Sequence, residues 1–259
     1  MLKQMRAVEA EQDTASTPEL WAATFAASAI MTANRIRRMQ RAPEWSLIRR
    51  HIPRGGSVLD AGCGFGEWVQ VLESNGYKGT GVDYSATLIS RLQEAYPTGS
   101  WIHSDIRNVP VSDGNFDGVI SWGVIEHDEA GPDAALREFH RILRPGGIAI
   151  VSVPQDSERQ RCAGGILFPS APTMAFFQYA MTGAELAAQC RAARFEVVRG
   201  GTIPGAAFAM LAPRLCMWAR TQGLAGRILE RAGSLATVPF SRYHLMTFAV
   251  ARKPDTKGK

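Results

Sequence analysis

The chain has 259 residues, of which 46% are hydrophobic and 20% charged, and this composition is typical of a globular protein that buries a substantial core. Four cysteines stand far apart with no Cys-x-x-Cys pair, so we expect neither a disulfide framework nor a metal site. The formal net charge of +5 leaves a nucleic-acid partner open, whereas the charged start and the lack of roughly 18 consecutive apolar residues argue against export and membrane spanning. We therefore expect a cytoplasmic protein.

Residues 1–54 are expected to form a helical leader that caps the core. Thr17-Pro18-Glu19 is a helix-start signal, and the alanine-rich, amphipathic segment 21–39 follows it. Seven arginines lie between positions 35 and 54, on helices whose other positions are apolar. A solvated helix face is the favoured interpretation of these arginines, and an anionic partner is the alternative.

The core that follows, expected over residues 55–200, alternates strands with helices. Continuous apolar strands in this alternation predict a doubly wound parallel sheet that binds ligands at the carboxyl ends of its strands. We expect strands at residues 57–61, 79–84, 100–104, 116–122 and 147–153, and helices at 66–75, 86–95 and 132–143.

The second half of the chain departs from strict alternation. Residues 155–180 are rich in Gly, Pro and aromatic residues and are expected to form a lid loop. A capping box predicts a helix at 183–193, before a strand at 195–199. An apolar helical insertion is expected at 201–240, and residues 241–259 should hold the last strand, at 243–252, and a polar tail. The predicted fold is thus α/β and Rossmann-like, with a seven-stranded, mostly parallel sheet, a helical N-terminal cap and this insertion.

One stretch of the core points to a ligand. Val58 and Leu59 run into Asp60, and glycines at 62, 64 and 66 follow, so a strand turns tightly into a helix with no Cβ to obstruct a bound molecule. The dinucleotide pattern G-x-G-x-x-G is not met, because Glu67 stands where the third glycine would be. The stretch therefore favours a nucleoside ligand without a pyrophosphate.

The motif Asp60-x-Gly62-x-Gly64-x-Gly66 resembles motif I of the class I methyltransferases that use S-adenosylmethionine. Ser104-Asp105-Ile106 resembles a later motif of that family, and residues 116–127 leading into Leu143-Arg-Pro-Gly-Gly resemble its small-molecule branch, which includes quinone-biosynthesis enzymes. The resemblance covers residues 55–154. It implies S-adenosyl-L-methionine as the cofactor, with these contact residues: Asp60, Gly62, Cys63, Gly64, Gly66, Asp83, Tyr84, Asp105, Ile106, Ser121 and Trp122.

Two acids have the most specific expected roles. Asp83 lies about 20 residues beyond the glycines, where an acid can accept both ribose hydroxyls; the alternative is a cap of the following helix, for which Ser85 is also available. By resemblance, Asp105 accepts the adenine amino group while Ile106 packs on the ring. The alternative for Asp105 is a turn-forming role.

The reaction that the resemblance implies is methylation of an oxygen or nitrogen of a small molecule. His127, just beyond the fourth strand, is the candidate catalytic base; the alternative is that it only hydrogen-bonds the loop over the cofactor. A methyltransferase of RNA or protein is disfavoured, because Ser121-Trp122-Gly123 stands where such enzymes have Asn or Asp-Pro-Pro-Tyr. We expect no DNA partner. A non-catalytic partner subunit would predict a damaged glycine loop, whereas this loop is intact.

The apolar insertion and the aromatic residues of the other irregular segments leave the acceptor side open to several interpretations. They can form extra core packing, a dimer interface, the roof of an apolar acceptor pocket, or a peripheral contact with a membrane. The two latter alternatives predict a hydrophobic or amphiphilic substrate, and the oligomeric state is left open. The expected substrate-side residues are Trp21, Phe25, Phe176, Phe177, Tyr179, Met210, Met217 and Trp218.

Overall fold

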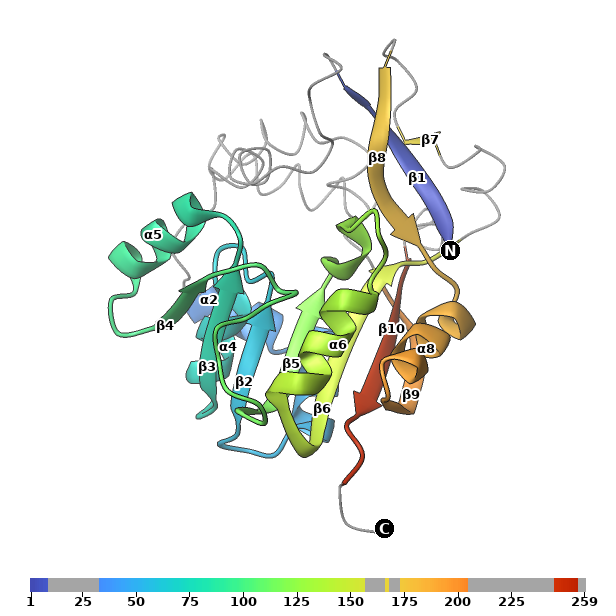
Figure 1. Ribbon diagram of the computed structural model, residues 1–259. Coiled ribbons are helices and arrows are strands. Elements are labelled where there is room, and N and C mark those ends of the chain that lie inside the picture. The colour runs from blue at the N-terminus through green and yellow to red at the C-terminus, as the bar shows by residue number, and fades with distance from the viewer. Residues whose placement is uncertain (9–32, 157–165, 168–172, 205–244, 256–259) are drawn as a thin grey trace.

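The structure, a computed structural model, describes residues 1–8, 33–156, 166–167, 173–204 and 245–255. Seven strands form one sheet in the order β4-β3-β2-β5-β6-β10-β9 (Figure 1). All neighbours from β4 to β6 are parallel, whereas β10 is antiparallel to both β6 and β9. This is the Rossmann-like, mostly parallel sheet that the sequence predicts. Its strands are β2 (Ser57–Ala61), β3 (Lys78–Asp83), β4 (Ser100–His103), β5 (Phe116–Trp122), β6 (Leu143–Pro154), β9 (Glu196–Pro204) and β10 (Leu245–Arg252).

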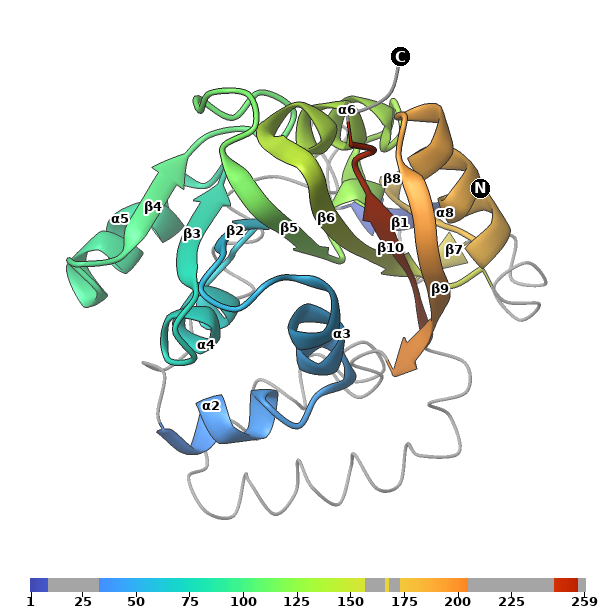
Figure 2. The same cartoon turned by 90° about the horizontal axis from the view of Figure 1, so that it is seen from below.

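Helices cover both faces of this sheet. One face carries α2 (Ala33–Met39), α3 (Pro43–His51) and α4 (Glu67–Glu73), and the opposite face carries α6 (Asp133–Ile142) and α8 (Gly183–Ala192) (Figures 1 and 2). The remaining helix, α5 (Ala86–Ala95), lies beside β3 and β4 at one edge. Such a three-layer arrangement leaves only the ends of the strands free for a ligand.

Neighbouring residues of each central strand point to opposite faces and so belong to different cores. Leu59 and Val119 pack with Leu136 and Phe139 of α6, whereas Val58 and Ile120 pack against α3. All of these strand residues have no exposed surface. Because each fully buried aliphatic side chain stabilises a fold by roughly 1.5–3 kcal/mol, the two cores hold the sheet rigidly beneath the strand ends.

The chain order places the switch point of the sheet between β2 and β5. From β2 the chain moves outward through β3 to β4, and it then returns to the other side of β2 as β5. The helices that follow these two strands, α4 and α6, lie on opposite faces of the sheet, and such a switch point opens a crevice at the carboxyl ends of the strands.

A second, three-stranded sheet corrects two expectations from the sequence. β1 (Leu2–Val8) pairs antiparallel with β8 (Thr173–Ala180) and parallel with β7 (Ile166–Leu167), and this small sheet stands beyond the strand ends of the large one (Figure 1). The helical leader is therefore wrong for Leu2–Val8, and the 155–180 lid loop contains a full strand. Strand pairing across more than 160 residues decides both structures, and local sequence patterns do not report such pairing.

The bounds of the last two strands, β9 and β10, differ from the predicted ones. β9 continues to Pro204, past the expected start of the insertion at 201, because it pairs with β10 along its whole length. Residues 205–240 of the insertion, and Tyr243 and His244 of the expected last strand, lie outside the described residues. Among the helices that the structure describes, none is long and apolar enough to cross a membrane.

Candidate cofactor and acceptor site

A cavity of about 350 Å³ lies at the carboxyl ends of β2 to β5, at the switch point of the sheet. Two loops supply most of the lining residues, one after β4 and one after β5 that contains the short helix η1 (Ile125–His127). The lining residues are Gly62, Gly64, Asp83, Tyr84, Leu88, Asp105, Ile106, Arg107, Trp122, Gly123, Val124, Ile125, His127, Asp128, Glu129 and Ala135.

Most of the residues predicted to contact the cofactor come together at this cavity. The candidate base, His127, also lines it, on the η1 side. Predicted contact residues that line the cavity are Gly62, Gly64, Asp83, Tyr84, Asp105, Ile106 and Trp122, whereas Asp60, Cys63, Gly66 and Ser121 are not among its lining residues.

The absence of Asp60, Cys63 and Ser121 from the lining has a structural cause, because the strand ends bury all three. Asp60 is 3% exposed, and burial, with the nearby charge of Asp83, raises its pKa to about 8. Ser121 donates its hydroxyl to the Ala61 carbonyl at 3.1 Å. Cys63 packs in the core with Trp101. These buried residues lie beneath the turn, and their contacts with the cofactor stay a prediction.

The three glycines of the turn have different reasons to be glycine. All have positive φ, at +81° for Gly62, +51° for Gly64 and +67° for Gly66. A Cβ on Gly62 would lie 2.5 Å from a Val124 methyl group, and one on Gly66 would lie 2.4 Å from the Trp101 ring. A Cβ on Gly64 would meet nothing within 4 Å, because it would project into open space. Close packing therefore requires Gly62 and Gly66, while Gly64 is the glycine that a ligand can approach.

This difference predicts separable effects of two alanine substitutions. Gly64→Ala should cost about 1–2 kcal/mol of stability through its positive φ, and should weaken S-adenosylmethionine binding further because the methyl group enters the cavity. Gly62→Ala adds a clash with Val124 to the same backbone strain, so it should lower the melting temperature much more. Thermal unfolding and calorimetric titration of both variants measure the two quantities. Equal losses of stability would contradict the assignment.

Asp83 joins the glycine turn to the start of α5. Its carboxylate accepts the Gly64 N–H at 3.0 Å and the Ser85 N–H at 2.9 Å, and it is only 6% exposed. Burial raises the pKa of Asp83, and these backbone N–H groups oppose the shift. The cap of α5 is supplied by Ser85, whose hydroxyl accepts the Leu88 N–H. Asp83 is thus held at the cavity wall, with the helix cap left to another side chain.

Asp105 has a partner that sequence reasoning missed. Both of its oxygens accept hydrogen bonds from Arg107, at 2.6–3.0 Å, and this guanidinium holds the pKa of Asp105 below its usual value. Arg107 also reaches the opposite wall, where it pairs with Asp128 at 2.9 Å. The resulting bridge links the loop after β4 to the loop after η1. An arginine one residue beyond Asp105-Ile106 carries no recognisable pattern, so only the fold shows its role.

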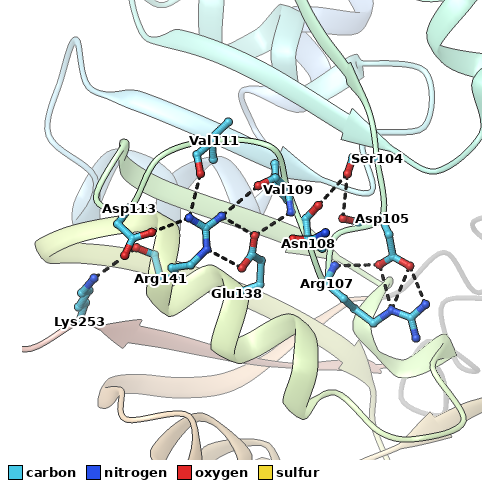
Figure 3. A network of polar contacts seen from close by, with 10 residues as sticks. All are labelled: Ser104, Asp105, Arg107, Asn108, Val109, Val111, Asp113, Glu138, Arg141 and Lys253. Carbon is cyan, nitrogen blue, oxygen red and sulfur yellow. Dashed lines mark hydrogen bonds and ion pairs between the residues drawn. The ribbon is translucent and has the colours of Figure 1, made fainter.

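The loop that carries Asp105 and Arg107 is anchored on α6 (Figure 3). Arg141 donates to both oxygens of Glu138 and to the carbonyls of Val109 and Val111, at 2.7–3.0 Å. Glu138 accepts the Val109 N–H at 2.7 Å, and Asp113 completes the network. Because these bonds tie the loop backbone to a buried helix, the wall of the cavity that bears Asp105 is preorganised.

The small sheet contacts the η1 side of the cavity. Tyr179 of β8 donates its hydroxyl to the Glu129 carbonyl at 2.9 Å, and Lys3 of β1 pairs with the Glu129 carboxylate at 2.6 Å. The Tyr179 ring contacts Phe176, with ring centroids 5.0 Å apart. Phe177 lies on the same strand. The other predicted substrate-side residues, Trp21, Phe25, Met210, Met217 and Trp218, lie outside the described residues.

Comparisons with known proteins agree with this geometry. A family model described as a methyltransferase domain matches residues 59–151. A probable S-adenosylmethionine-dependent methyltransferase of Mycolicibacterium smegmatis is 33% identical over 106 residues, covering 40% of each chain. A malonyl-[acyl-carrier protein] O-methyltransferase of Enterobacter lignolyticus is 30% identical over 119 residues, covering 46% of this chain and 47% of that protein. The chain thus spans less than half the length of these curated relatives.

Solved structures share the fold at low sequence identity. A putative sarcosine dimethylglycine methyltransferase from Galdieria sulphuraria superposes with a TM-score of 0.59 at 12% identity, covering 92% of this chain and 98% of that one. The [4+2]-cyclase SpnF superposes with a TM-score of 0.57 at 22% identity, covering 81% of this chain and 79% of that one. With the sheet order and the glycine turn, the match shows that residues 59–151 form a methyltransferase domain of the class I, S-adenosylmethionine-dependent type.

Proposed function

We propose that this protein transfers the methyl group of S-adenosylmethionine to an oxygen or nitrogen of a small, hydrophobic or amphiphilic molecule. The observation that carries the proposal is the cavity at the switch point, where Gly64 leaves open space, Asp83 and Asp105 offer carboxylates, and His127 stands on the facing wall. These residues fit a nucleoside with a charged tail, because hydroxyl and amino donors meet acids while the backbone approaches closely.

Different residues of the cavity bind different parts of the cofactor. Asp83 accepts the ribose hydroxyls, Asp105 the adenine amino group, and Ile106 packs on the adenine ring, while Gly64 leaves room for the methionine part. Since Arg107 already occupies both oxygens of Asp105, it must yield part of that carboxylate to the adenine amino group. The methyl sulfonium is itself a reactive donor, so the protein contributes mainly alignment and exclusion of water.

An apolar acceptor is supported by the side chains next to the cofactor part of the cavity. Trp122, Val124 and Ile125 line the cavity between the glycine turn and η1. The Phe176 and Tyr179 rings stand on the small sheet, which contacts η1. A molecule that enters beside His127 therefore meets aromatic and aliphatic surface as well as the carboxylates of Asp128 and Glu129, which are paired with Arg107 and Lys3. One matched relative is named for O-methylation of malonyl-[acyl-carrier protein], and another, from Staphylococcus epidermidis, is named a demethylmenaquinone methyltransferase.

A methyl-transfer screen tests the proposal. The protein is first titrated calorimetrically with S-adenosylmethionine and S-adenosylhomocysteine, and it is then incubated with methyl-labelled S-adenosylmethionine and metabolite extracts split into organic and aqueous fractions. We expect both compounds to bind and the label to enter molecules of the organic fraction. Label found only in polar metabolites would contradict the hydrophobic acceptor, and label found in protein or RNA would contradict the small-molecule acceptor.

A further inference from the structure

Among the buried polar atoms without a hydrogen-bond partner in the part of the chain that the structure describes, two lie in the stretch from the end of β5 to η1. They are the indole Nε1 of Trp122 and the carboxyl Oε2 of Glu126. Glu126 is 1% exposed, so its carboxyl cannot turn to bulk solvent. Leaving a buried polar group unpaired costs about 1–3 kcal/mol, and such groups in a folded protein call for an explanation.

The two groups belong to one short stretch at the end of β5. Trp122 is the last residue of β5; it lines the cavity, and its ring packs on Trp68 of α4 with centroids 5.8 Å apart. Glu126 follows in η1. Its Oε1 lies 3.4 Å from where a Cβ on Gly123 would stand, and the terminal methyl group of Met246 lies 3.5 Å from the same point. The Glu126 carboxyl therefore adjoins Gly123, which lines the cavity, and Met246 at the start of β10, while Glu126 itself is not among the lining residues.

We propose that Trp122 and Glu126 form the polar end of the acceptor subsite and donate hydrogen bonds to one oxygen of the methyl acceptor. The inference rests on the proposed function, and it narrows the acceptor to an apolar molecule that carries a carbonyl or comparable oxygen. The flanking Trp68 and Met246 side chains provide the apolar surroundings for the rest of that molecule.

The chemistry of the two groups fixes what they can bind. An indole N–H only donates, so the ligand atom opposite Trp122 must be an acceptor. Burial raises the pKa of Glu126 to about 8, and its own backbone N–H partly opposes the shift, so near pH 7 the carboxyl is protonated and can donate as well. In the proposed subsite both donors bind the same oxygen, which is how a pair of donors binds a carbonyl.

Neighbouring charges do not alter this protonation state. Among the described residues, the titratable groups near Glu126 are His127, Asp128 and Glu129 along the chain, Tyr179 on β8, and Lys3 on β1, which pairs with Glu129. Asp128 pairs with Arg107, and Tyr179 donates to the Glu129 carbonyl. None of these groups is among the causes of the Glu126 pKa shift.

The oxygen held by Trp122 and Glu126 differs from the atom that is methylated. Methyl transfer needs a free lone pair on the nucleophile, and two donors directed at that atom would occupy its lone pairs. The acceptor therefore carries two polar atoms, one held by this pair and the other, the nucleophile, on the side of His127. The two contacts fix the orientation of the acceptor, which is where enzymes of this kind gain most of their rate.

Acetophenone is a suitable probe, because it is apolar, does not ionise and offers one carbonyl oxygen; ethylbenzene is its oxygen-free match. Both are titrated by ligand-observed NMR against protein saturated with S-adenosylhomocysteine. We expect the wild type to bind acetophenone about tenfold more tightly than ethylbenzene. Trp122→Phe and Glu126→Leu should each weaken the binding of acetophenone about fivefold and leave the affinity for ethylbenzene unchanged.

The pH dependence of acetophenone binding shows whether the Glu126 carboxyl donates a hydrogen bond or only borders the subsite. Wild-type affinity for acetophenone should fall as pH rises through about 8, because the ionised Glu126 carboxylate no longer donates. Glu126→Gln keeps a neutral donor and should lose this dependence. Glu44→Gln is the matched control, since burial also raises the pKa of Glu44 but it lies in the first turn of α3.

Two results would overturn the inference. One is equal affinity for the two probes, and the other is unchanged acetophenone binding in Glu126→Leu while S-adenosylhomocysteine binding proves that the variant is folded. Because the titration needs no turnover, its failure is distinct from a failure of the proposed function, which the methyl-transfer screen alone decides.

Discussion

Replacing Asp83 with alanine is expected to weaken S-adenosylmethionine binding by roughly 10- to 150-fold, which corresponds to about 1.5–3 kcal/mol. The carboxylate is nearly buried at the cavity wall and already accepts the Gly64 and Ser85 N–H groups. Alanine removes the charge-assisted acceptor for the ribose and leaves these two N–H groups to find other partners. Isothermal titration calorimetry with S-adenosylmethionine and S-adenosylhomocysteine measures the loss.

A second variant and a control separate binding from folding. Asp83→Asn keeps the shape and one carbonyl acceptor but loses the charge, so its affinity should lie between those of the wild type and Asp83→Ala. Asp133→Ala removes another acid, at the exposed start of α6, where it pairs with Arg137. It should bind the cofactor as the wild type does. Wild-type affinity in a folded Asp83→Ala protein would show that Asp83 does not hold the ribose.

The part of the fold that the sequence predicts well is the part whose signals are local. Val58 and Leu59 of β2 form a continuous apolar run, and both are fully buried; the predicted strands 57–61 and 116–122 match β2 and β5. The helix predicted at 86–95 matches α5 because Ser85 caps it, and the capping box of Thr182 and Glu185 is present at the start of α8. Periodicity and caps act over a few residues, so one sequence suffices to find them.

Long-range pairing is what the sequence could not show. Gln4 of β1 pairs with Gln178 of β8, and their buried side chains share a hydrogen bond of 2.6 Å. No sequence pattern near either glutamine indicates that its strand partner lies 174 residues away along the chain. The same limit hid the role of Arg107, whose importance comes from Asp128 on the opposite wall of the cavity.

The sequence predicted the candidate site to the extent that motif residues line the cavity. A motif reports that a residue type recurs at a position, but not whether its side chain points into the cavity or into the core. Asp60, Cys63 and Ser121 are buried and do not line the cavity, and a Cβ on Gly66 would meet a tryptophan ring. Burial is a property of the folded neighbours, so the sequence could not separate these residues from Gly64 and Asp83.

Replacing His127 with alanine is expected to lower turnover by about 10²-fold or more on an acceptor that is methylated at a hydroxyl, with little change in cofactor affinity. His127 lines the cavity on the wall that faces the glycine turn, next to the buried Glu126. A hydroxyl must lose its proton as the methyl group arrives, and an imidazole at this wall can accept that proton. The measurements are single-turnover rates at saturating cofactor and S-adenosylhomocysteine affinity by calorimetry.

The pH profile decides whether His127 acts as a base or only supports the loop. With a base at work, the rate falls as pH drops and the imidazole becomes protonated, and His127→Asn, which keeps a hydrogen-bond donor, is as slow as His127→Ala. His140→Gln is the control, because the ring of this histidine packs on the Phe195 ring, with centroids 5.2 Å apart, and His140 does not line the cavity. If His127→Asn restores wild-type turnover, or if the variants lose cofactor affinity while the saturated rate is unchanged, His127 holds the loop and the proton leaves by another route.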